Sequence, residues 1–258
     1  MQHDPTSTDQ RPSRRTVTRA AAWSVPVVAA ATAAPAYAAS CPAVNVTSAN
    51  ITTYNRVSAT EWTATFDRDG SGPLLSNVLT ARATYDNGMS VRNDAGTAAG
   101  GTNDNFTLAT SVGGLGVSGL VMAQRPTVDT PNAPLNAFGH YAFTFTRAVT
   151  NLSFTLTDID STSGDFWDSV WLTPGFTLSN KAAGLQGDGS AGSPLKQTNG
   201  NVAVDNANGG AGNVTVTYPG PITAFTINYS NAATSFAANV DQDQVVTITN
   251  FTFDYKPC

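Results

Sequence analysis

Residues 141–160 have the sequence YAFTFTRAVTNLSFTLTDID, and this stretch decides the fold class. Its apolar residues alternate with small or polar ones in two runs. They are Tyr141, Phe143 and Phe145 in the first run and Leu152, Phe154 and Leu156 in the second. A period of two is typical of antiparallel strands that bury one face. Arg147 to Asn151 separate the two runs, and we therefore predict an antiparallel hairpin with one apolar face.

The same alternation recurs towards the C-terminus. Apolar stripes are formed by Val214, Val216 and Tyr218, by Phe225, Ile227 and Tyr229, and by Val246, Ile248, Phe251, Phe253 and Tyr255. Pro219-Gly220-Pro221 ends the first stripe, since proline and glycine interrupt strands. The last stripe changes parity after Ile248, and a bulge near Asn250 would reconcile its two halves.

Composition supports strands over helices. Charged residues make up only 12% of the chain, and Glu61 is its only glutamate, whereas ordinary soluble domains carry about 25%. Threonine favours strands, and asparagine, aspartate and glycine favour turns. We predict an all-β fold, an antiparallel β-sandwich with a jelly roll as one arrangement. Long polar loops are expected at 96–105 and 184–212, within one domain spanning residues 39–258.

The N-terminus resembles a twin-arginine (Tat) export signal. Arg14 and Arg15 precede an alanine-rich run, which ends in a small-residue cleavage site at Ala36 and Ala38. Charge, apolar stretch and cleavage site in this order predict a signal peptide over residues 1–38, without fixed structure and removed on export. Its partners would be the Tat translocase and signal peptidase, and its destination the cell surface or the medium.

Two other interpretations of this segment remain open. A membrane-spanning helix needs about 20 strongly apolar residues, and the run is mostly alanine and contains Pro26 and Pro35. We therefore expect no membrane span. A lipoprotein signal would use Cys41, but Ala38 stands where such signals favour leucine and Pro42 follows directly.

Charge and cysteine content set further limits. Removal of residues 1–38 takes away four arginines and two aspartates and lowers the formal charge from −5 to −7, so nucleic acid is not an expected partner. The chain has two cysteines, Cys41 and Cys258. In an oxidising compartment they predict one disulfide that joins the two ends, with two unrelated free thiols as the alternative.

Aspartates gather after the second run of the opening stretch. Asp158 and Asp160 continue the period of Leu152 to Leu156, and Asp165 and Asp168 follow. Carboxylates at the edge of a core need a counter-charge, and oxygen ligands on a loop suit Ca²⁺. The four aspartates are therefore candidate ligands of a structural Ca²⁺ ion, and solvated turn residues are the alternative.

Two weaker acidic patterns accompany this cluster. Asp67 to Gly72 imitates the first half of a calcium loop, but Val78 stands at its twelfth place. Asp241 and Asp243 precede the last strand pattern and could converge with the other carboxylates on one ion.

Aromatic residues beside the cluster suggest a ligand platform. Trp167 and Trp171 would share a face of a strand, and exposed rings stack sugars in many carbohydrate-binding sandwiches; packing in the core is the alternative. The sequence offers few residues for nucleophilic catalysis. His140 is the only histidine after the predicted cleavage site and has no serine or cysteine motif around it. A glycosidase would need two carboxylates, which aspartates could provide.

Residues 143–174, FTFTRAVTNLSFTLTDIDSTSGDFWDSVWLTP, resemble a segment of secreted β-sandwich surface proteins of actinobacteria, in which paired strands end in a D-x-D turn. The resemblance implies an extracellular, non-enzymatic module and assigns no active residues. We therefore expect a binding or structural module that recognises a surface glycan or protein. The alternatives are a polysaccharide-active enzyme that uses aspartates and a subunit of a surface assembly.

Overall fold

The computed structural model describes residues 42–67, 76–95, 101, 103–127, 137–237 and 243–256. Ala43–Pro257 form one compact unit. The strands are β1 (Val44–Thr47), β2 (Ile51–Ser58), β3 (Glu61–Phe66), β4 (Asn77–Asp86), β5 (Met89–Val91), β6 (Leu108–Ala109), β7 (Gly119–Pro126), β8 (Phe138–Thr157), β9 (Ser161–Thr162), β10 (Phe166–Leu172), β11 (Thr177–Ser179), β12 (Leu185–Gln186), β13 (Lys196–Gln197), β14 (Val214–Tyr218), β15 (Ile222–Asn231) and β16 (Gln244–Tyr255).

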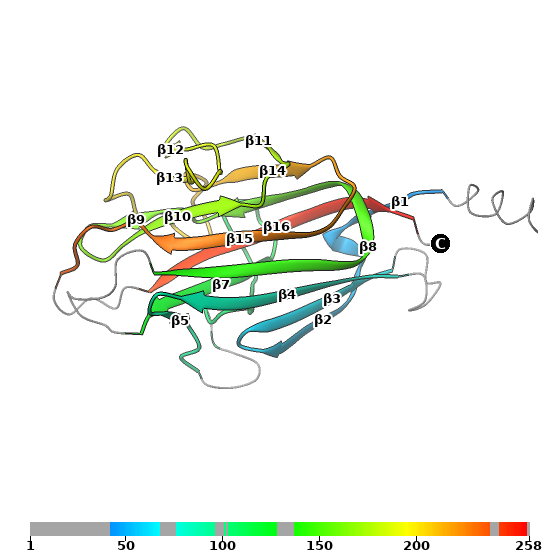
Figure 1. Cartoon of the computed structure of the whole chain (residues 1–258), viewed down its shortest axis with the longest axis horizontal. Helices are drawn as coiled ribbons and strands as arrows, with labels where there is room; N and C mark the ends of the chain where they lie inside the picture. The colour runs from blue at the N-terminus through cyan, green and yellow to red at the C-terminus, as the bar shows by residue number, and fades with distance from the viewer. Residues whose placement is uncertain are drawn as a thin grey trace, which may run out of the picture. The chain divides into compact units, whose positions relative to one another are not determined.

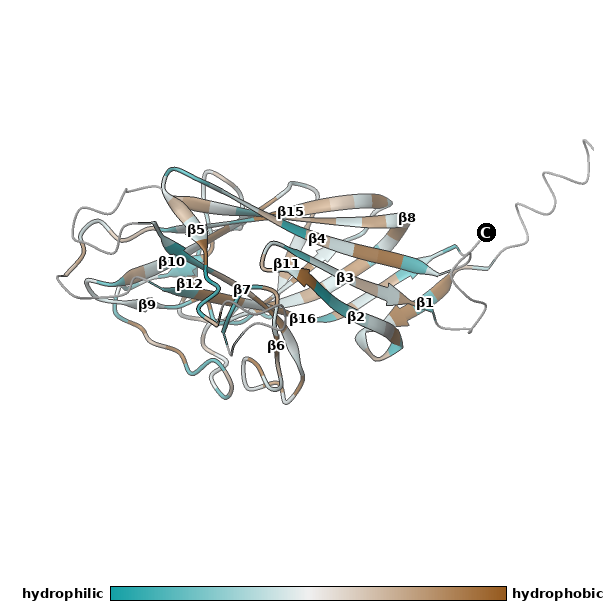
Figure 2. Ribbon diagram, turned by 90° about the horizontal axis from the view of Figure 1, so that it is seen from below, coloured by the Kyte–Doolittle hydropathy of each residue, from teal (hydrophilic) through white to brown (hydrophobic). Residues whose placement is uncertain are grey.

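The described residues confirm the all-β antiparallel prediction. Their only helical element is one 3-10 turn, η1 (Ser48–Asn50), and none of them forms a helix long and apolar enough to cross a membrane. A 14-stranded sheet follows the order β2-β3-β4-β8-β15-β10-β9, with further strands attached to β8 through β14 and β16. The sheet curls over so that β15, β8 and β4 form one layer and β16 and β7 the other (Figures 1 and 2).

The predicted hairpin at residues 141–156 is wrong, because both runs belong to the single 20-residue strand β8. The segment between them has neither glycine nor proline to reverse the chain. Instead Asn151 takes a left-handed conformation (φ 51°), and the buried parity changes between Val149 and Leu152. Such a bulge bends a strand and moves its side chains to the other face.

The bulge lets β8 serve both layers. Its first half pairs with β4 and β15, and its second half pairs with β14 and β16. The predicted irregularity in β16 is confirmed: Asn250 has φ 54°, and the register with β8 shifts between Thr249 and Thr252. Both interruptions use asparagine, which tolerates the left-handed region better than most side chains.

Aromatic rings fill the space between the layers. Phe154 stacks on Phe225 of the opposite layer at 5.1 Å between ring centroids and lies 5.7 Å from Phe251 of the neighbouring strand β16. Phe143 stacks on the other side of the cluster, 4.8 Å from Phe225. The alternation in residues 141–156 therefore does place its apolar residues in one core, although not through a hairpin.

The core predicts a large effect of truncating its central ring. Phe154→Ala should lower the free energy of unfolding by about 3–5 kcal/mol, because it removes a fully buried ring and leaves a cavity. Thr144→Ala, on the exposed face of the same strand, is the matched control and should cost less than about 1 kcal/mol. Urea denaturation measures both, and equal losses would contradict this assignment of the core.

Candidate ligand pocket

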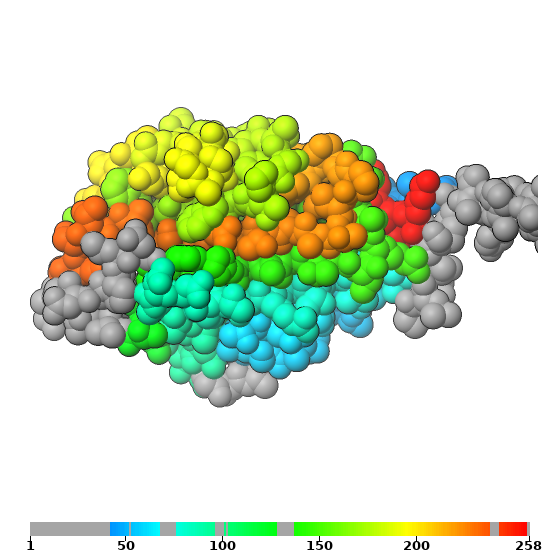
Figure 3. Space-filling model, viewed as in Figure 1, coloured from blue at the N-terminus to red at the C-terminus, as the bar shows by residue number. Residues whose placement is uncertain are grey.

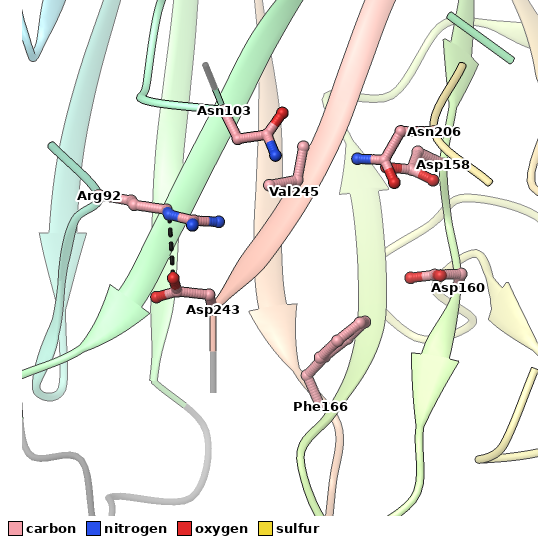
Figure 4. A pocket seen from close by; sticks show the side chains of 8 residues that line it. All are labelled: Arg92, Asn103, Asp158, Asp160, Phe166, Asn206, Asp243 and Val245. Carbon is pink, nitrogen blue, oxygen red and sulfur yellow. Dashed lines mark ion pairs between the residues drawn. The ribbon is translucent and has the colours of Figure 1, made fainter. Parts of the chain in front are cut away.

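One end of the fold contains a polar pocket of about 230 Å³. Figure 4 shows its walls: Asp158 and Asp160 point inward from one side, and Arg92 and Asp243 stand on the other. The described residues that line it are Arg92, Asn103, Asp158, Asp160, Phe166, Asn206, Asp243 and Val245. These residues come from loops and strand ends that lie far apart in the sequence.

The acidic wall begins where β8 stops at Thr157. Asp158 is left-handed (φ 67°), so the period of two does not continue through it. The loop before β14 then packs against the turn: the Ile159 N–H donates to the Gly212 carbonyl at 3.3 Å. A Cβ atom on Gly212 would lie 2.6 Å from the Ile159 nitrogen, so only glycine allows this approach.

Asp158 is the least satisfied group of the pocket. Its side chain belongs to a residue only 3% exposed, and its Oδ1 atom has no hydrogen-bond partner. Burial, then the nearby charges of Asp160 and Asp205, raise the pKa of Asp158 to about 8. An unpaired buried acceptor costs about 1–3 kcal/mol, which points to a missing donor.

Asp160 is also buried, with 7% exposure. Its Oδ2 accepts a hydrogen bond from the Val204 N–H at 2.8 Å. Burial raises the pKa of Asp160 to about 6, although this hydrogen bond opposes the shift. Two adjacent acidic groups that both resist ionisation are typical of carboxyls without a counter-charge.

Asp168 lies behind this wall and is fully engaged by the protein. Its Oδ1 accepts from the Tyr229 hydroxyl at 2.6 Å and from Gln244 Nε2 at 2.9 Å, and its Oδ2 accepts from the Asp160 N–H at 3.2 Å. Burial, followed by repulsion from Asp160, holds the pKa of Asp168 well above its usual range. Asp168 therefore fixes the backbone of Asp160 and does not line the pocket.

The opposite wall carries an ion-pair network. Arg92 Nε lies 2.9 Å from Asp243 Oδ2 and 2.9 Å from Asp94 Oδ2, and Arg125 also pairs with Asp94 at 2.8 Å. The Asp243 side chain is 10% exposed. The positive charge of Arg92 is thus neutralised on its own side of the pocket.

The structure separates the predicted site residues. Asp158 and Asp160 line the same pocket. Asp243 also lines it, as expected if distant carboxylates converge, whereas Asp241 lies outside the described residues. Burial excludes the solvated-turn interpretation for Asp158 and Asp160. Asp165 is half-buried, and its carbonyl accepts from Asn231.

The two predicted platform tryptophans have different surroundings. Trp167 donates its indole N–H to the Gln197 carbonyl at 3.1 Å, and Lys196 Nζ lies 4.8 Å from its ring centroid. Gly200 also packs on this ring, since a Cβ there would come within 3.3 Å. Trp171 is half-buried and tilts against Phe138 at 5.9 Å. Neither ring lines the pocket.

Sequence patterns did not point to Arg92, Asn103, Asn206 or Phe166. The sequence could have indicated Phe166, because in a strand it faces the same side as Asp168 and the opposite side from Trp167. His140, which has no catalytic motif around it, contacts Asn228 Oδ1 at 2.5 Å and Asp86 Oδ2 at 3.0 Å.

The predicted Ca²⁺ site stays a prediction. Among the described ranges, no group of three or more histidine, cysteine, aspartate or glutamate side chains is placed to hold a metal ion. The calcium-like pattern at residues 67–72 lies outside those ranges from residue 68 onward. Two carboxyls of the predicted set, Asp158 and Asp160, do share one pocket.

No protein-family model matches the chain, and no curated protein matches it either.

The buried carboxyls predict that stability falls as pH rises. The folded state holds protons on Asp158 and Asp160 more tightly than the unfolded state, so the free energy of unfolding should decrease between about pH 5 and pH 8. Asp158→Asn should reduce this slope and stabilise the protein by a few kcal/mol at about pH 8, since one pKa unit corresponds to about 1.4 kcal/mol.

Urea denaturation across this pH range, with chelator present, measures the slope. The matched control is Asp188→Asn, an exposed aspartate whose pKa is lowered by hydrogen bonds to Ser190, and it should leave the slope unchanged in this window. A stability that rises with pH in the wild type would refute the buried-carboxyl interpretation.

Proposed function

We propose that the chain is an extracellular, non-enzymatic binding module that holds a glycan in the acidic pocket. The observation that carries the proposal is the composition of the pocket wall. Carboxyl and amide groups from Asp158, Asp160, Asn103 and Asn206 converge on one concavity beside the ring of Phe166 (Figure 4). Convergent polar groups in a concave site are the usual features of a ligand pocket.

A sugar ring matches this wall chemically. Its hydroxyl groups donate and accept hydrogen bonds, as carboxyl and amide side chains do, and its C–H faces pack on aromatic rings. The carboxyl groups of Asp158 and Asp160, which line the pocket, would accept hydrogen bonds from its hydroxyl groups. Phe166, and not the predicted Trp167 and Trp171, is therefore the aromatic ring proposed to contact the sugar.

A polysaccharide-active enzyme is the second candidate. Asp158, with its pKa raised to about 8, faces Asp243 across the pocket (Figure 4), and a protonated acid opposite a second carboxylate is the arrangement that glycoside hydrolysis uses. Sugar release abolished by Asp158→Asn would establish this alternative in place of the binding module.

A structural Ca²⁺ ion is an alternative occupant of the same wall. Asp158 and Asp160 would supply carboxylate oxygens and the nearby asparagines amide oxygens, which are ligands that Ca²⁺ accepts. Asp165 and Asp168 complete the set predicted from the sequence. A rise in melting temperature with calcium that Asp160→Ala erases would support the ion, since a ligand bound only by the native state stabilises it.

Export supplies the cellular context of the proposal. Arg14, Arg15, Ala36 and Ala38 lie outside the described residues, so the Tat signal rests on sequence alone. So does the resemblance to secreted actinobacterial surface proteins. If neither binding nor sugar release is found, the third proposal, a subunit of a surface assembly, gains support, and size-exclusion chromatography for self-association would test it.

The proposed disulfide gains an indirect argument from strand register. Cys41 and Cys258 lie outside the described residues. However, β1 and β16 pair with Val44 opposite Tyr255, and each of these residues is three positions from its cysteine. The two cysteines are thus equally far in sequence from a pair of residues on adjacent strands, which is compatible with a disulfide between them.

The export proposal predicts the form of the protein in culture medium. Its N-terminus should lie near Ala39, because Ala36 and Ala38 suit the small-residue requirement of signal peptidase. Replacing Arg14 and Arg15 by lysine should block or strongly slow export. Intact-mass measurement and non-reducing peptide mapping would report the N-terminus and the Cys41–Cys258 link together. A lipid adduct on Cys41 or two alkylatable thiols would count against the proposal.

The binding proposal predicts that Phe166 contributes more to glycan affinity than Trp171 does. On a glycan array, Phe166→Ala should weaken binding about tenfold, which corresponds to about 1.4 kcal/mol, whereas the matched control Trp171→Ala should bind as wild type. A reducing-sugar assay on the same polymers should show no release. Loss of binding in Trp171→Ala alone would place the ligand at Trp171 and not in the pocket.

A further inference from the structure

We infer that the glycan bound in the pocket carries free amino groups, and that Asp158 and Asp160 bind one ammonium group of an unacylated amino sugar. This inference rests on the proposed function and specifies its ligand class.

The charge balance of the pocket is incomplete on one side. No lysine, arginine or histidine among the described residues forms an ion pair with Asp158 or Asp160. Among the described residues of the lining, Arg92 is the only cation, and it lies against Asp243 and Asp94. Buried carboxylates without a partner are strongly unfavourable, so the site lacks a positive charge that a ligand could bring.

The carboxyl groups of the acidic wall define where that charge would lie. Asp158 is 97% buried, and its Oδ1 lacks a donor, while Asp160 lines the same wall. Asp160 Oδ2 is already occupied by the Val204 N–H. An ammonium group has three donors and no acceptor, which matches a wall that offers acceptors.

The remaining wall favours an organic cation over a metal ion. Ca²⁺ requires six to eight oxygen ligands, and no three acidic or metal-ligating side chains in the described residues gather to provide a core for it. The pocket of about 230 Å³ is several times the ~30 Å³ that a water molecule occupies in the liquid. Phe166 also lines it, and an aromatic ring attracts organic cations as well as sugar C–H groups.

Proton exchange provides an independent readout. The groups that face the pair are Asp168 and Tyr229 from behind, Asp205 beside it, and Asp243 with Arg92 across the pocket. Burial of both groups, and repulsion of Asp158 by Asp160, favour protons on the pair. An ammonium group stabilises the ionised carboxylates, so binding should release about one proton to the solvent.

Isothermal titration calorimetry on residues 39–258 tests the inference with two matched probes, a glucosamine oligosaccharide and its fully N-acetylated counterpart. At about pH 6.5, where amines are protonated, the glucosamine oligosaccharide should bind at least about tenfold more tightly. Titration in two buffers of different ionisation enthalpy should reveal the released proton. Asp158→Asn and, separately, Asp160→Asn should remove most of the preference and the proton release, while the control Asp188→Asn should keep both.

The outcomes separate the inference from the proposed function. Equal or tighter binding of the acetylated probe would overturn the ammonium site and leave the glycan module standing. Binding lost with chelator and restored by Ca²⁺ would also overturn it, in favour of a metal. No binding of either probe, and none of any glycan on the array, would overturn both. Melting curves of each variant would exclude unfolding as the cause of a loss.

Discussion

Continuous pairing of both edges of β8 is the constraint on which the rest of the structure depends. Backbone N–H and C=O groups buried away from water must find partners, and the 20 residues of this strand find them in four neighbours. A straight strand would serve only one layer. The bulge at Asn151 turns the second half towards β14 and β16, so the two layers share one strand and enclose one aromatic core.

The end of β8 also determines the chemistry of the pocket. Leu156 is the last apolar core residue of β8, and the turn that follows places Asp158 and Asp160 on either side of the buried Ile159, next to other polar groups. Asp168, Tyr229 and Gln244 form the buried network behind them. Fully connected buried networks are rigid, whereas an unpartnered member is costly. Asp158 Oδ1 is such a member: it is buried beside the pocket and has no hydrogen-bond partner among the described residues.

Local pattern was sufficient for some features and not for others. Alternation identified the buried residues of β8, β14 and β15, and the parity change located the bulge at Asn250. The same reasoning predicted a hairpin in β8, because a period change looks alike whether the chain reverses or only bulges. Which of these occurs depends on distant strands. The pocket shows the same limit: the aspartates were visible as a cluster, but Arg92, Asn103 and Asn206 join them only through the curl of the sheet.

Pairing of the first and last strands determines how the module would carry a mechanical load. β1 and β16 are antiparallel neighbours, with Val44 beside Tyr255 at one end of their ladder. A force applied to the start of β1 and the end of β16 acts at the same end of the ladder. It would therefore break the hydrogen bonds between the two strands one after another, and not all at once in shear. A covalent link between the ends would divert that force around the folded domain. Resistance to traction at a cell surface would then depend on the cysteine pair and not on the sheet.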